Sequence, residues 1–399
     1  MRVLSETIPG VRSVAVGVWI RHGSAHEPRE RMGETHLLEH MVFKGTERRT
    51  AHEIALSLEI LGGSLDAFTS REHTSFQARV LDAHLPQALD VLSDMVRNPV
   101  LRQRDLDVER EVVLEEIAQV EDTPDDQVFE LHGARLWQGH PYGHAILGTR
   151  DTVSSLSIDD LRTLHATHYQ GRHLVVAAAG NVDHDRFLDL VAQHWGDAPE
   201  GAAPEPAPPA DACESGRVHV ARETAQAHLV VGTRTVAHAH RLRVPLILLS
   251  QAFGGGMSSR LFQRIREELG LAYTVFSFQS FYARAGLSGV YLGTRPGQEG
   301  RAEEALRGEF QRLASEGLDA MDLAQTRQQV KGQIMLSLES TSSRLYRLAG
   351  SALREEPWLD LDALLARVDA VTDDDVREAA RLAYDPDIQL TLHLGPSSP

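Results

Sequence analysis

Two histidines and a glutamate stand close together near the N-terminus, in a spacing that suits metal-assisted chemistry. Residues 36–40 read HLLEH, so on a helix the side chains of His36, Glu39 and His40 project from one face. Neutral imidazoles four residues apart can hold one divalent cation, and a neighbouring carboxylate can take a proton from water. The alternative is a polar helix face, or a satisfied histidine pair in the core, that binds no ligand.

A third ligand would have to come from another part of the chain, and the segment that begins near residue 105 offers candidates. Its apolar spacing predicts an amphipathic helix, whose projection turns Glu109 and Glu116 inward and Glu111 and Glu115 outward. Two inward carboxylates are costly to bury without compensation, and a divalent cation held by the two histidines would provide it. A salt bridge to a buried arginine is the alternative.

The composition limits the other possibilities. With 57 acidic against 40 basic residues the formal charge is −17, which disfavours a phosphate-binding surface and therefore nucleic acid as a partner. No apolar run reaches the roughly 18 residues of a membrane span, and no targeting segment is visible, so we expect a cytoplasmic protein with no membrane partner. The single cysteine, Cys213, leaves histidines and carboxylates as metal ligands.

The chain of 399 residues divides into two similar halves. A proline- and alanine-rich stretch at 197–216 predicts a linker between domains at 1–196 and 217–399. Residues 105–136 align without a gap with residues 322–353 and share their apolar helical spacing. Each half reads as strands, a helix, a strand pair, several helices and a closing strand, which is an α+β pattern.

The duplication is asymmetric at the ionisable positions. The second half has Ile247, Ser250, Gln251 and Gln333 where the first half has His36, Glu39, His40 and Glu116. Chemistry that needs ionisable groups is therefore expected in the first half.

HLLEH, followed after 75 residues by Glu116, is similar to the pattern of the pitrilysin (M16) family of zinc peptidases. The similarity is greatest to its shorter bacterial members, which are related to the β subunit of mitochondrial processing peptidase. It continues through HMVFKGT, LDAFTSREHTSF, AGNVD and, in the second half, GGGMSSRLFQRIREELGLAYTVFSF. The resemblance implies a zinc metalloendopeptidase of two homologous α+β domains, each a mostly antiparallel sheet with flanking helices.

The resemblance also implies roles for individual residues of the first half. His36, His40 and Glu116 would hold one zinc ion per chain. Glu39 would be the general base, and Glu109 would orient a ligand. The same three ligands could also hold manganese or cobalt.

In the second half, Arg266 and Tyr273 match the pair that family members bring to the substrate carbonyl. A cationic fork and a phenol donor suit the oxyanion of a tetrahedral intermediate. Asp126 and Glu130 match acids that contact a substrate arginine in the processing peptidase.

The segment 64–69 resembles the family's edge strand, to which a substrate peptide is added as a further strand. Asp66, Ala67 and Phe68 are therefore expected to contact the substrate. Asp66 stands where many members have asparagine, and its charge would either favour basic substrate residues or alter the hydrogen bonding of the substrate.

The length of the chain bears on its partners. At 399 residues it resembles one half of the family's clamshell, so the resemblance implies a second chain. Because this chain carries both the zinc residues and the Arg/Tyr pair, we expect a homodimer that encloses peptides or unfolded segments in a chamber. A heterodimer with a zinc-free homologue, and a non-catalytic or partner-dependent subunit of a processing complex, are the alternatives.

Overall fold

The computed structural model describes residues 1–396, which form two compact units of related architecture. Unit 1 consists of Met1–Ala118, His144–Ala207 and Leu336–Trp358, and the remaining residues form unit 2. Each unit contains one mixed five-stranded sheet with helices packed against it. The predicted α+β class with two homologous domains is confirmed.

The sheet of unit 1 has the order β1-β5-β2-β4-β3, in which β1 and β5 are parallel and all other neighbours are antiparallel. Its strands are β1 (Arg2–Thr7), β2 (Ser13–Ile20), β3 (Ser64–Thr69), β4 (Thr74–Leu81) and β5 (Leu174–Gly180). The last strand in this order, β3, leaves one edge without a neighbouring strand among the described residues.

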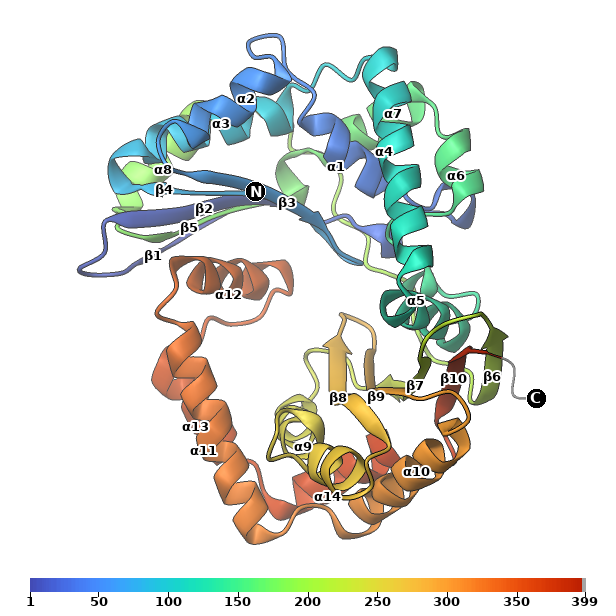
Figure 1. The fold of residues 1–399 in the computed structure, drawn as a ribbon. Coiled ribbons are helices and arrows are strands. Elements are labelled where there is room, and N and C mark those ends of the chain that lie inside the picture. Colours follow the sequence, from blue (N-terminus) through green and yellow to red (C-terminus); the bar gives the residue numbers. More distant parts are fainter. Residues whose placement is uncertain (397–399) are drawn as a thin grey trace. The chain divides into compact units, whose positions relative to one another are not determined.

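Helices cover both faces of this sheet (Figure 1). The helices around the first face are α1 (Glu34–Val42), α2 (Ala51–Glu59), α3 (Leu85–Arg97), α4 (Gln103–Asp122), α6 (Arg150–Ser155), α7 (Ile158–His168) and α8 (His184–Trp195). The second face is covered by α12 (Thr341–Leu353), which packs on β1, β2 and β5. Apolar helix packing on both faces explains why β2 is buried along nearly its whole length.

The contact between α12 and the sheet is built from small and large apolar side chains. Alanines of β2 and β5 leave room for the helix, and Leu345 and Leu348 of α12 fill the space beside Trp19. Because these groups are almost fully buried, α12 is part of the core of unit 1 although it belongs to the C-terminal half of the sequence.

Unit 2 repeats this plan. Its sheet has the equivalent order β6-β10-β7-β9-β8, and again only the first pair is parallel. The strands are β6 (Gly216–Ala221), β7 (Ala227–Thr235), β8 (Ala272–Phe281), β9 (Gly286–Thr294) and β10 (Leu390–Gly395). The helices are α5 (Pro124–Leu136), α9 (Arg243–Gly254), α10 (Glu299–Glu316), α11 (Ala320–Ser337), α13 (Leu361–Asp369) and α14 (Asp373–Tyr384), together with a π-helix, η6 (Phe262–Glu268).

The two units exchange helices. α5 lies in the N-terminal half of the sequence but packs on β7 and β10 of unit 2, as its counterpart α12 packs on unit 1. The long helices α4 and α11 carry the chain from one unit into the other. The predicted linker contains no helix or strand between residues 199 and 215. The compact units thus divide the chain differently from the expected continuous ranges 1–196 and 217–399, which describe the duplication along the sequence.

No helix among the described residues is long and apolar enough to cross a lipid bilayer.

Candidate metal centre

The helix α1 starts at a left-handed glycine and is held there by a buried carboxylate. Gly33 has φ = 90°, and a Cβ at this position would come within 2.6 Å of the Leu147 carbonyl oxygen, so the turn requires glycine. The carboxylate of Glu27 accepts hydrogen bonds from the amides of Gly33 (2.9 Å) and Thr35 (2.8 Å). Burial raises the pKa of Glu27 to about 8, while the hydrogen bonds from Thr35 and Gly33 oppose this rise and satisfy N–H groups that the first turn of a helix leaves without a partner.

Apolar side chains fix the rotation of α1 about its axis. Leu37, Leu38 and Met41 are fully buried in the core of unit 1. The remaining face presents His36, Glu39 and His40, as the helical spacing predicts. Of these three side chains, His36 and His40 are partly exposed and Glu39 is buried.

The helix α4 brings Glu116 to this face of α1. His36 Nε2 lies 3.7 Å from Glu116 Oε2, and His40 Nε2 lies 3.7 Å from Glu116 Oε1. Within residues 1–396 these three side chains form the one group of His, Cys, Asp or Glu whose ligand atoms all lie within 4.8 Å of one another. Two ligands of a tetrahedral zinc ion are about 3.4 Å apart, since each bond is about 2.1 Å long. The donor types and their spacing therefore fit a divalent cation such as zinc.

Glu109, which lies two turns before Glu116 on the same face of α4, supports one of these ligands. Its Oε2 lies 3.0 Å from His40 Nδ1, and its Oε1 forms an ion pair with Lys44 Nζ at 2.5 Å. A proton on Nδ1 leaves the Nε2 lone pair of His40 free to bind a cation. Sequence reasoning missed Lys44, although it lies four residues after His40 on the same side of the chain.

Glu39 is 8% exposed and faces the edge strand β3. Its Oε2 accepts a hydrogen bond of 2.5 Å from the hydroxyl of Thr69, the last residue of β3. Burial raises the pKa of Glu39. Burial also raises the pKa of Tyr169, and the negative charge of Glu39 acts in the same direction. The sequence could not assign Thr69 as a partner of Glu39, because Thr69 reaches it from a distant element.

The strand β3 has the bounds predicted for the edge strand, Ser64–Thr69. Leu65 and Ala67 pack against the core on the side of α1. Asp66 and Phe68 point to the opposite face of the sheet, where the Phe68 ring lies 6.0 Å from that of Tyr346 on α12. The three predicted substrate contacts thus lie on two different faces of one strand.

The other predicted residues belong to unit 2. Arg266 lies in the π-helix η6, and its guanidinium is 4.7 Å from the ring centre of Tyr273 and 4.5 Å from that of Phe262. The Tyr273 side chain is 73% exposed, and Arg266 and Tyr273 line one pocket of about 350 Å³. Asp126 is exposed and Glu130 is half-buried, both on α5.

Four further histidines of unit 1 form a stack that is separate from the metal ligands. The rings of His22 and His168 are 3.9 Å apart, His26 lies 5.2 Å from His22, and His173 lies 5.1 Å from His168. Burial, reinforced by the neighbouring imidazoles, lowers the pKa of His168 to about 4 and that of His22 well below its usual range. This stack is a group of neutral imidazoles at neutral pH.

A duplicated α+β architecture with a His, His, Glu group at an edge strand is the arrangement of a metallopeptidase family. The model of the family described as insulinase (peptidase family M16) matches residues 2–150, and that of the peptidase M16 inactive domain matches residues 155–330. The chain therefore belongs to peptidase family M16.

Individual relatives agree with this assignment. A protein of Streptomyces coelicolor named as an uncharacterized zinc protease is 41% identical over 96% of this chain and 84% of its own length. The β subunit of the mitochondrial-processing peptidase of Pongo abelii is 32% identical over 95% of this chain and 79% of its own. A crystal structure of a peptidase M16 inactive domain from Pseudomonas fluorescens has the same fold, with a TM-score of 0.92, 19% identity and coverage of 99% of this chain and 95% of that one.

Proposed function

We propose that this protein is a zinc-dependent metalloendopeptidase that hydrolyses peptides or unfolded polypeptide segments. The observation that carries the proposal is the convergence of His36, His40 and Glu116 beside the buried carboxylate of Glu39. Membership of peptidase family M16 and relatives that are named zinc proteases support it.

Zinc in this site would act as a Lewis acid toward the scissile carbonyl and would increase the acidity of a water molecule. Glu39 is the general base in this proposal: its carboxylate takes a proton from the attacking water and delivers one to the leaving amine. Its burial suits this role, because a raised pKa brings a carboxylate closer to the pH at which it must both accept and release a proton. The Thr69 hydroxyl fixes the rotamer of the base through its hydrogen bond to Oε2.

Substrate would bind as an additional strand on the free edge of β3. Backbone groups of Asp66, Ala67 and Phe68 would pair with it, and this pairing accepts many different side chains. Because Thr69 of the same strand contacts Glu39, a peptide on this edge would be close to the proposed base. Pairing by the backbone requires an extended segment, which accounts for the proposed preference for peptides and unfolded chains.

Arg266 and Tyr273 are proposed to stabilise the developing oxyanion of the substrate. The stacking of the guanidinium on the phenol ring supports this role, because it keeps the two side chains next to each other. Asp126 and Glu130 are proposed to contact a basic substrate residue.

For the assembly we propose a homodimer that encloses the substrate in a chamber, in the cytoplasm of a bacterium. The presence of both the metal ligands and the Arg/Tyr pair in one chain supports two equal subunits. A heterodimer with a zinc-free homologue is the competing assembly. The oligomeric mass of the purified protein, with the identity of any copurifying chain, distinguishes the two.

The test is cleavage of an internally quenched, arginine-containing peptide by wild type and Glu39→Gln, with the metal content of each measured. Wild type should cleave, and Glu39→Gln should be silent while still holding about one zinc per chain. Glu115→Gln is the matched control, because Glu115 lies on the same helix as Glu116 but is exposed. A zinc-loaded wild type that cleaves no peptide would instead support a non-catalytic or partner-dependent subunit.

A further inference from the structure

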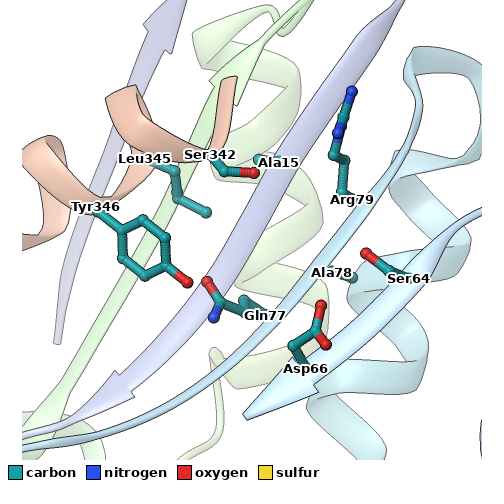
Figure 2. A pocket seen from close by; sticks show the side chains of 9 residues that line it. All are labelled: Ala15, Ser64, Asp66, Gln77, Ala78, Arg79, Ser342, Leu345 and Tyr346. Carbon is teal, nitrogen blue, oxygen red and sulfur yellow. The ribbon is translucent and has the colours of Figure 1, made fainter. Parts of the chain in front are cut away.

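A polar pocket lies on the face of the unit 1 sheet that α12 covers, at its border with the edge strand β3 (Figure 2). Its volume is about 140 Å³. Side chains of β3 and β4 line the pocket on the side of the sheet, and side chains of α12 line it on the opposite side. The polar residues that line the pocket are Ser64, Asp66, Gln77, Arg79, Ser342 and Tyr346.

The strand register places the two charged groups of this pocket at different depths from the free edge. Asp66 lies on the edge strand itself and pairs with Gln77, whereas Arg79 lies one strand further in and pairs with Ser64. Figure 2 shows the carboxylate of Asp66 on the same side of the pocket as the Gln77 amide, while the Arg79 side chain extends away from Asp66. A side chain that enters from the free edge therefore meets the carboxylate before the guanidinium.

Asp66 makes no salt bridge within residues 1–396, and it is exposed. The hydroxyl of Tyr346 points toward Gln77 (Figure 2), so the wall opposite Asp66 offers further polar groups. A charged carboxylate surrounded by hydrogen-bonding groups attracts a cation that carries several N–H donors. The formal charge of −17 also attracts peptides that carry basic side chains.

The size of the pocket limits its occupant to one side chain. Its volume of about 140 Å³ is on the order of ten times the roughly 10–15 Å³ that a cavity needs to hold one water molecule, which suffices for a long side chain and is too small for a folded partner. A strand added to β3 would place alternate side chains on the two faces of the sheet. One set would face α1 and the metal ligands, and the other set would lie beside Asp66 and Tyr346.

We propose that this pocket is a specificity subsite that binds a lysine or arginine side chain of the substrate, on the face of β3 opposite the metal centre. The proposal rests on the proposed peptidase function and on binding of substrate along β3. It predicts that the basic residue stands an odd number of positions from the substrate residues that face the metal ligands. The subsite is distinct from Asp126 and Glu130, which belong to unit 2.

The test uses a series of quenched peptides that differ only in the position of one lysine in a neutral sequence, with glutamine as the reference at each position. The ratio of kcat/KM for lysine over glutamine should reach about tenfold at one position in wild type, the size of one charge-assisted hydrogen bond. In Asp66→Asn this ratio should fall to about one. Arg79→Gln, which changes a charge in the same pocket, should keep or increase the ratio.

Binding of the same peptides to zinc-loaded Glu39→Gln, followed by fluorescence anisotropy, separates the two proposals. Wild type could cleave no peptide while lysine is still preferred in binding and Asp66→Asn removes that preference. This result would support the subsite and contradict the proposed peptidase function. If wild type cleaves peptides without a position-dependent preference for lysine, or Asp66→Asn retains it, the subsite is refuted. A preference for an acidic side chain that is lost in Arg79→Gln would also refute it.

Discussion

Replacing Glu109 by glutamine should weaken zinc binding although all three proposed ligands remain. Glu109 is 3% exposed, and its two oxygens contact His40 Nδ1 and Lys44 Nζ. Glutamine preserves the shape and one acceptor, but it is neutral and its NH₂ group cannot accept a hydrogen bond from the ammonium. His40 would be oriented less firmly, and Lys44 would lose its counter-charge.

The magnitude follows from these two contacts. A hydrogen bond between charged groups contributes about 1.5–3 kcal/mol, and the lower end applies here because the Lys44 side chain is 35% exposed. We therefore expect the metal-free Glu109→Gln protein to lose about 1–2 kcal/mol of unfolding free energy. Loss of a ligand-orienting partner typically lowers metal affinity by 10–100-fold, and we expect about tenfold because one acceptor for His40 remains.

Zinc affinity is measured by competition with a chromophoric chelator, and stability by urea unfolding of the metal-free protein. Glu115→Gln, on the exposed side of α4, should change neither quantity. A Glu109→Gln protein that is destabilised but binds zinc as tightly as wild type would refute the orienting role. Equal losses in Glu115→Gln would attribute the effect to overall charge instead.

Three further predictions concern the elements around the site. Glu27→Gln should lower the unfolding free energy by about 1 kcal/mol, measured by urea unfolding, because one of the two oxygens that accept hydrogen bonds from the N–H groups at the start of α1 becomes an NH₂ group, which cannot accept. Metal-free wild type should lose stability as the pH falls from about 6.5 toward 4, because the unfolded chain takes up protons that the histidine stack, with its lowered pKa values, excludes. The melting temperature, measured as a function of pH, should fall less steeply in His168→Gln than in wild type. If it falls equally steeply in both, the histidine stack is not the cause of the pH dependence. Leu345→Ala should cost about 2–5 kcal/mol in urea unfolding because Leu345 is buried between α12 and the sheet, whereas Leu336→Ala, at a position 70% exposed, should cost little.

Much of the metal centre could be predicted from the sequence because its signals are local. The spacing of His36, Glu39 and His40 depends only on helix geometry, and the structure contains that helix. The same periodicity separates Glu109 and Glu116, which turn inward, from Glu115, which is exposed. The mostly antiparallel sheets and the duplication could also be predicted, since alternation and self-similarity are properties of the chain itself.

Other features depend on contacts between distant segments and could not be predicted this way. The hydrogen bond from Thr69 to Glu39 and the contact of Lys44 with Glu109 require the placement of α1 against β3 and α4. The pairing of α12 with the first sheet was also inaccessible, because an apolar stripe predicts that a helix packs but does not specify the surface that it covers. The left-handed Gly33 was visible only as a glycine before a helix.

The exchange of α5 and α12 means that the two halves of the sequence are not independent folding modules. A fragment of residues 1–196 would lack α12 and would expose the apolar face around Trp19, and a fragment of residues 217–399 would lack α5. Neither fragment should therefore form a stable protein alone, whereas the two produced together should assemble by fragment complementation. Cleavage within 199–215 would, for the same reason, leave two fragments held by the buried surfaces of both exchanged helices. This protein could thus be divided into two chains at its linker, with each chain completing the core of the other.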